Sequence, residues 1–116
     1  EFFSKSKIKL HFTNKITENQ SLHAEIRRNL YLCYKEALNN IYKHSKATDV
    51  YITFSLENEL LKLEISDNGI GLPKEKNQKG NGFYNMQNRM TEISGSLQIP
   101  DVEKGTLLQF ISRTEL

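Results

Sequence analysis

The chain has 116 residues, of which 37% are apolar and 26% charged, and its net charge is +2. This length predicts one domain over residues 1–116 without need of disulfides, and the interleaved charges argue against a nucleic-acid partner. The longest apolar run, residues 30–34, is far shorter than the roughly 18 residues of a membrane span, so we expect no direct membrane contact. The lone Cys33 suits a reducing cytosol, so we expect a cytoplasmic chain or the cytoplasmic part of a membrane-anchored receptor.

The first half of the chain predicts a strand, a long helix and a hairpin. Residues 8–13 alternate between apolar and polar, which is typical of a strand with one buried face. From Ser21 to about Ser45 the period changes to three or four, which predicts an amphipathic helix with Cys33 on its buried side. Residues 50–65 contain two further alternating runs around a short turn and predict a β-hairpin that packs on the helix.

The second half predicts a long loop, a shorter helix and two strands. Residues 67–82 contain four of the six glycines and little apolar periodicity. A helix is expected from about residue 82 to 93, with Gly95 as its C-terminal cap, and strands near 96–99 and 106–112. The order of elements predicts an α+β two-layer sandwich with helices on one face of a largely antiparallel sheet.

Three polar residues on the long helix form the first candidate site. Glu36, Asn40 and Lys43 fall within about 60° of one another at 100° per residue. Asn40 can coordinate Mg²⁺, Glu36 can orient or deprotonate a nucleophile, and Lys43 can neutralise phosphate. A solvated helix face without a function explains the same triplet.

The second candidate site is Asp67-Asn-Gly-Ile-Gly71, which directly follows a predicted strand. The sequence is also typical of a hairpin turn, but the polar run after it does not read as a strand. A carboxylate at a strand end can accept a hydrogen bond from the exocyclic amine of a base such as adenine. Gly69 and Gly71 would let the backbone approach a flat ligand.

The third candidate site is the pair of glycines, Gly80 and Gly82, at the start of the second helix. Backbone N–H groups at a helix N-terminus can bind phosphate, although loop flexibility explains the glycines equally well. Neither a P-loop nor a Rossmann pattern is present. The three sites occur in order over 47 residues, and each suits a different part of a nucleotide, so we interpret them jointly as a nucleotide site.

These segments resemble a known family. Residues 36–44 (EALNNIYKH) are similar to the N box of the ATP-binding superfamily of gyrase, the heat-shock chaperone, histidine kinases and MutL. Residues 67–71 (DNGIG) and 80–89 (GNGFYNMQNR) resemble its two glycine boxes. The amino-acid sequence of these boxes is similar to that of the catalytic domain of bacterial two-component sensor histidine kinases, especially the subgroup that pairs with LuxR-type response regulators. The likeness covers about residues 8–112.

The resemblance implies a Bergerat ATP-binding fold with a mixed, mostly antiparallel sheet, and ATP and Mg²⁺ as ligands. It implies a catalytic role for Glu36, which would polarise the nucleophile, and magnesium binding by Asn40. It also implies a lid at about residues 73–81. The remaining residues that it assigns to nucleotide binding are Lys43, Asp67, Gly69, Gly71, Gly80, Gly82 and Thr106.

The acceptor histidine of such kinases is carried by a separate dimerisation domain, and nothing in this sequence matches that domain. The resemblance therefore implies that the chain transfers phosphate to a histidine of the same parent protein, a homodimer that signals to a response regulator. The chain itself is expected to be monomeric. An anti-sigma-factor type of serine kinase and an ATP-sensing module without phosphotransfer are the alternatives.

Overall fold

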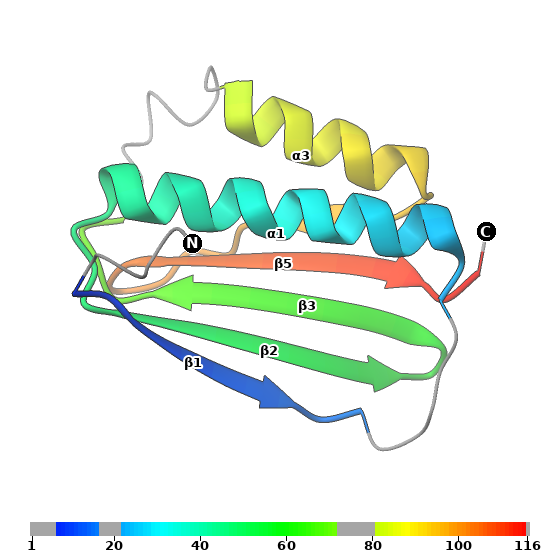
Figure 1. Cartoon of the computed structure of the whole chain (residues 1–116), viewed down its shortest axis with the longest axis horizontal. Coiled ribbons are helices and arrows are strands. Elements are labelled where there is room, and N and C mark those ends of the chain that lie inside the picture. The colour runs from blue at the N-terminus through cyan, green and yellow to red at the C-terminus, as the bar shows by residue number, and fades with distance from the viewer. Residues whose placement is uncertain (1–6, 17–21, 72–80, 116) are drawn as a thin grey trace.

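The computed structural model describes residues 7–16, 22–71 and 81–115, apart from the side chains of residues 81 and 82. In this part of the chain, five strands form one mixed sheet and two helices lie on the same face of it (Figure 1). The predicted two-layer α+β architecture is confirmed. Neither helix is long and apolar enough to cross a membrane. The elements in chain order are β1 (Lys9–Asn14), α1 (Ala24–His44), β2 (Asp49–Glu57), β3 (Leu60–Asp67), α3 (Asn81–Glu92), β4 (Ser96–Gln98) and β5 (Thr106–Arg113).

The sheet has the strand order β1-β2-β3-β5-β4. β1 pairs with β2 in parallel, because α1 carries the chain back between them, and the other three pairings are antiparallel. The predicted hairpin is β2–β3, and its two turn residues, Asn58 and Glu59, have φ angles of 52° and 66°. Positive φ at both positions is typical of the two-residue turn that matches the twist of a hairpin.

α1 packs its apolar stripe on the sheet, as its three- and four-residue period predicts. It begins at Ala24, later than Ser21 suggests, and the Nδ1 of His23 accepts a hydrogen bond from the Glu25 N–H at 3.2 Å. Cys33 is fully buried, which confirms the prediction that it belongs to the core, and burial raises the pKa of its thiol to about 12. The buried apolar residues of the helix are Ile26, Leu30, Cys33, Ala37, Leu38 and Ile41.

α3 packs against α1, β4 and β5. Its buried side chains include Met86 and Met90. The expectation for Gly95 needs a correction, because the left-handed residue after this helix is Ser94, with φ 57°, and Gly95 follows it and donates its N–H to the Met90 carbonyl at 2.7 Å. A side chain at Gly95 is excluded for another reason: its Cβ would lie 2.5 Å from the Ile111 carbonyl oxygen.

Candidate functional site

The centre of the candidate site is a pair of polar residues at the ends of two neighbouring strands. Asp67 is the last residue of β3 and Thr106 the first of β5, and the two lie directly opposite each other in the antiparallel pairing. Asp67 continues the row of buried inward-facing residues formed by Leu61, Leu63 and Ile65. Side chains that face each other across two strands share one face of the sheet. Asp67 and Thr106 therefore both face the layer of helices.

The C-terminal part of α1 lies over this pair and encloses a small cavity with it. The cavity has a volume of about 20 Å³, enough for about one water molecule. Asn40 and His44 line it from α1, and Phe83 lines it from the first turn of α3. Its other lining residues are Ala37, Ile41, Ser45, Ile65, Asp67, Gly71, Thr106 and Leu108. The structure thus brings together Asn40, Asp67, Gly71 and Thr106 from the predicted set.

Gly69 allows the loop after β3 to contact the end of α1. A Cβ at Gly69 would lie 2.2 Å from the Ser45 carbonyl oxygen, and the same oxygen accepts the Ile70 N–H at 2.8 Å. The Ser45 hydroxyl donates to the Ile41 carbonyl at 2.7 Å and accepts the Ala47 N–H at 3.0 Å. The helix end and the loop are therefore joined by main-chain contacts that leave no room for a side chain at Gly69.

Gly71 and Gly105 make a second close approach at the same end of the sheet. Their φ angles are +80° and +73°, which L side chains rarely adopt. A Cβ at Gly105 would lie 1.8 Å from the Asp67 carbonyl oxygen, and one at Gly71 would lie 3.0 Å from the Gly105 carbonyl oxygen. Two glycines from distant parts of the chain thus set the backbone around Asp67.

The Asp67 carboxyl is buried. Its side chain is 6% exposed, and its Oδ1 accepts the Gly69 N–H at 2.8 Å. Burial raises the pKa of this carboxyl, and the hydrogen bond from Gly69 partly opposes that effect. A buried carboxylate with one protein donor has remaining lone pairs, so it can accept further hydrogen bonds from a ligand.

Asn68 ties the same loop to the start of β2. Its Oδ1 accepts the N–H groups of Thr48 and Asp49 at 3.0 and 3.1 Å, and its Nδ2 donates to the Thr48 hydroxyl at 2.9 Å. The loop is thereby held from both sides, by α1 through Gly69 and by β2 through Asn68.

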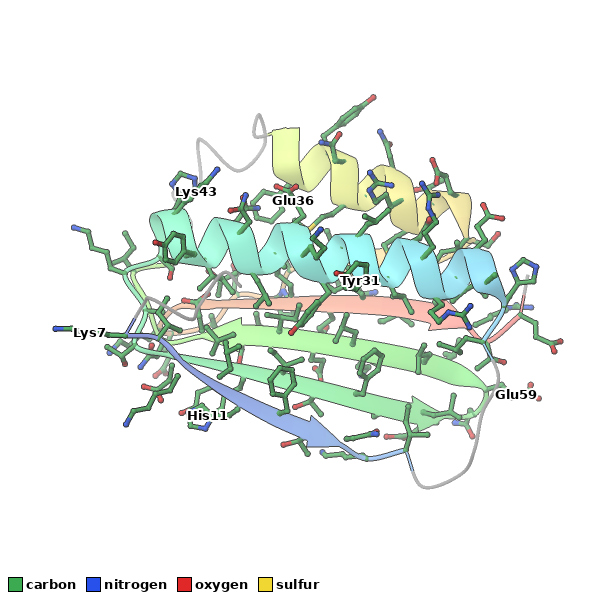
Figure 2. All side chains as sticks on the ribbon, viewed as in Figure 1. Lys7, His11, Tyr31, Glu36, Lys43 and Glu59 are labelled. Atoms are coloured by element: carbon green, nitrogen blue, oxygen red, sulfur yellow. The ribbon has the colours of Figure 1, made fainter. Side chains whose placement is uncertain are left out.

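Glu36 and Lys43 do not line the cavity. Glu36 is half-buried and Lys43 is exposed, and Figure 2 shows both projecting from α1 away from the sheet. Gly82 is the second residue of α3, at the helix N-terminus where phosphate binding is predicted. Gly80 and most of the predicted lid, residues 73–80, lie outside the described residues.

A magnesium ion fits the donors present only if a ligand supplies most of its oxygens. Among the described residues no three His, Cys, Asp or Glu side chains are grouped to hold a metal. Asn40 lines the cavity and carries a neutral amide oxygen. Mg²⁺ commonly takes one or two protein oxygens and completes its coordination with phosphates and water. The donor set is therefore compatible with a metal that arrives with a nucleotide.

Sequence reasoning did not find the role of three residues at the site. Ser45 provides the carbonyl against which Gly69 packs, and Asn68 fastens the loop. Gly105 lies directly before β5 and approaches the Asp67 carbonyl closely. The available signal for Gly105 is the glycine itself, since glycine is favoured where the backbone takes a positive φ or approaches another group closely.

The chain belongs to the family of histidine kinase-, DNA gyrase B- and HSP90-like ATPases, whose model matches residues 25–114. The match includes all three candidate sites. The family resemblance found in the sequence is thereby confirmed.

Within this family, the chain is similar to sensor histidine kinases. It is 43% identical to the sensor histidine kinase YvfT of Bacillus subtilis over 77 aligned residues. The alignment covers 66% of this chain and 20% of that protein. It is 30% identical to the sensor histidine kinase LiaS of the same species over 94 aligned residues. That alignment covers 79% of this chain and 26% of that protein. The chain thus spans about a fifth to a quarter of the length of these curated relatives.

Solved structures share the fold. The histidine kinase domain of a blue-light activated histidine kinase from Erythrobacter litoralis superposes with a TM-score of 0.80 over 95% of this chain and 53% of that one, at 18% identity. The ATP-binding domain of PrrB from Mycobacterium tuberculosis gives a TM-score of 0.69 over 90% of this chain and 80% of that one, also at 18% identity. At this level of identity the likeness concerns the fold alone.

Proposed function

We propose that this chain is the ATP-binding catalytic domain of a sensor histidine kinase, and that it transfers the γ-phosphoryl group of ATP to a histidine on a separate dimerisation domain of its parent. The observation that carries the proposal is the buried Asp67 carboxyl, paired with Thr106 beneath Asn40, in a chain of this ATPase family. The kinship with sensor histidine kinases supports the choice of acceptor. A response regulator is then the downstream partner.

In this proposal Asp67 binds the exocyclic amine of adenine and Thr106 supports it through its hydroxyl. The lone pairs that Gly69 leaves on the carboxylate are available for this bond. Gly69 and Gly71 keep the wall of the base pocket free of side chains. A donor-bearing purine is preferred for this reason, and GTP, which presents a carbonyl at that position, should bind poorly.

Asn40 would hold Mg²⁺, which supplies charge neutralisation of the phosphates when it is bound. Lys43 and the backbone near Gly80 and Gly82 would contact the phosphates. Glu36 lies one turn before Asn40 on α1 and would polarise the incoming histidine. Its position outside the small cavity suits this role, because the acceptor comes from another domain.

A purine base cannot enter a cavity of about 20 Å³ unless some lining residue moves. Phe83 is the lining residue best suited to move, since it is half-buried and sits in the first turn of α3. A wide groove of about 770 Å³ adjoins the cavity at Gly71 and Thr106, which provides an open approach. We infer that nucleotide binding displaces the Phe83 ring.

Labelled ATP tests the activity in the full-length parent. The expected product is a phosphorylated histidine, which is labile to acid and stable to base. A stable phosphoserine on a partner protein would contradict the proposal and favour the serine kinase. ATP binding without any phosphotransfer would favour the sensing module. Titration of this chain with ATP, with and without Mg²⁺, tests the binding step separately.

Glu36→Gln separates binding from transfer. We expect the variant to bind ATP with an affinity within about twofold of the wild type, because Glu36 does not line the cavity. Phosphotransfer in the parent should fall by about 10²-fold or more, the usual contribution of a positioned base. Glu25→Gln, in the first turn of the same helix, is the matched control and should leave transfer unchanged. Equal turnover of the Glu36 variant would remove this residue from the mechanism.

A further inference from the structure

An apolar groove separates α1 from the edge of the sheet on the side away from α3. It has a volume of about 290 Å³, and among its lining residues are Phe12 of β1, Phe54 of β2 and Tyr31 and Tyr34 of α1. We call it the tyrosine groove. An apolar cavity of about 150 Å³ holds one benzene ring, so this groove has room for about two large side chains.

The groove exists because the two helices do not cover the whole sheet. α3 contacts β4 and β5, and no helix in the described part of the chain lies on the other side of α1, over β1 (Figure 1). Phe12 projects there with 64% of its surface exposed, and Tyr31 with 56%.

The charged side chains that the structure describes beside the groove have one sign. Arg27 lines it, and the Lys35 ammonium lies 5.5 Å from the centre of the Tyr31 ring. No carboxylate lines the groove within the described residues, and Glu25 and Glu36 lie about 120° and 140° from Tyr31 around the helix. Neither cation forms an ion pair with another described residue. Two cations beside exposed rings favour an occupant that brings both apolar and acidic side chains.

We propose that the tyrosine groove is a docking site for a partner protein that presents an acidic amphipathic helix. Apolar residues at i, i+3, i+4 and i+7 of that helix would pack on Phe12, Tyr31 and Tyr34. Carboxylates on its flanks would pair with Arg27 and Lys35. This mode of recognition needs only a groove that accepts a few apolar anchors and charges that set the orientation. The proposal does not depend on nucleotide binding, because none of these residues lines the candidate nucleotide cavity.

The test uses two synthetic helical peptides of about 14 residues, with leucines at i, i+3, i+4 and i+7 and either glutamates or lysines on the flanks. Calorimetry with the whole chain should show that the glutamate peptide binds at least about tenfold more tightly than the lysine peptide. The double variant with Arg27→Glu and Lys35→Glu should reverse that preference. Equal binding of the two peptides, or no binding of either, would overturn the proposal.

Tyr31→Ala should weaken binding of the glutamate peptide by about fivefold or more, since exposed aromatic anchors dominate such contacts. Tyr84→Ala is the matched control, because Tyr84 is 67% exposed on α3, outside the groove, and it should change binding by less than about twofold. Circular dichroism and ATP titration would establish that both variants are folded. Sedimentation of the free chain tests whether a second copy of the chain occupies the groove instead. Self-association that Phe12→Ser abolishes would assign the groove to a second copy and overturn the proposal.

Discussion

The two ends of α1 contact the rest of the molecule in opposite ways. In its N-terminal half, side chains reach α3: the Asn29 amide donates to the Arg89 carbonyl at 2.8 Å and the Glu92 carboxylate at 3.0 Å, and the Cys33 thiol lies 3.7 Å from the Met86 carbonyl. At its C-terminal end, the main chain of Ser45 contacts Gly69 directly.

The difference between side-chain and main-chain contacts indicates where the molecule can tolerate substitutions. A contact made by a side chain can be weakened by degrees, because the substituted side chain only removes what it contributed. A contact between two main chains has no side chain to shorten, and any added atom must displace the backbone. We therefore expect the site end of the molecule to be far less tolerant than the end that anchors α3, and four substitutions test that comparison.

Gly105→Ala should have the largest effect. Its Cβ would meet the Asp67 carbonyl oxygen at 1.8 Å, and alanine is strained at a φ of +73°. Overpacking and left-handed strain together predict a loss of about 3–4 kcal/mol in the free energy of unfolding, measured by urea titration. Lys104→Ala, one residue earlier and exposed, is the control and should change stability by less than about 0.5 kcal/mol. A Gly105 variant as stable as the wild type would show that the site end of the molecule tolerates an added side chain.

Asn29→Ala should lower the free energy of unfolding by less, about 2 kcal/mol. The variant loses one hydrogen bond to a carbonyl and one to a carboxylate, and part of that loss is offset because the Oδ1 of Asn29 is buried without a partner in the described structure. Asn88→Ala, at an exposed position on α3, corrects for the higher helix propensity of alanine. Identical unfolding midpoints for the two variants would show that the contact between Asn29 and α3 contributes nothing.

Asp67→Asn should weaken ATP binding by roughly 10-fold to 150-fold, the value of a hydrogen bond to a charged acceptor, as calorimetry would measure. An unchanged dissociation constant would remove Asp67 from the site. Asp101→Asn, on an exposed loop, is the control for a change of the same type.

The same variant should affect stability in the opposite direction without nucleotide. Burial raises the pKa of Asp67 above its ordinary value of 3.8, so folding favours the neutral carboxyl. The wild type should therefore lose stability relative to Asp67→Asn as the pH rises from 3.8 through the higher folded pKa, and the difference should persist at neutral pH. Thermal unfolding from pH 3 to 7 measures it, and a constant difference over that range would contradict the assignment of a buried carboxylate.

Periodicity predicted most of the fold because each element buries one face. The three- and four-residue spacing of α1 and the alternation of the hairpin follow from that requirement, and both elements form as expected. The start of α1 and the cap of α3 were less accurate, since a helix boundary depends on single hydrogen bonds such as the one that His23 accepts.

The candidate site was predictable in its residue types more than in its geometry. The strand pattern places Asp67 on the inner face. Its position opposite Thr106, which lies 39 positions later in the chain, depends on the pairing of β3 with β5. Likewise, the close approach of Gly105 to Asp67 is a contact between distant segments, which local patterns do not report.

Asp49→Asn should have the smallest effect, because this contact at the site end is made by side chains and the partners of Asp49, Thr48 and His11, are exposed. Hydrogen bonds from the Thr48 hydroxyl and from His11, at 2.7 and 2.8 Å, hold the pKa of Asp49 below its ordinary value of 3.8. The stabilisation is therefore present above pH 3.8 and is lost as the pH falls through the folded pKa. The variant should unfold about 1–2 °C below the wild type at pH 6, and this difference should shrink as the pH falls below 3.8. Figure 2 shows His11 at the edge strand, away from the helices, so ATP affinity should not change. A loss of stability as large as that of Gly105→Ala would mean that side-chain contacts at this end tolerate substitution no better than main-chain contacts. The contrast between the two ends of α1 would then fail.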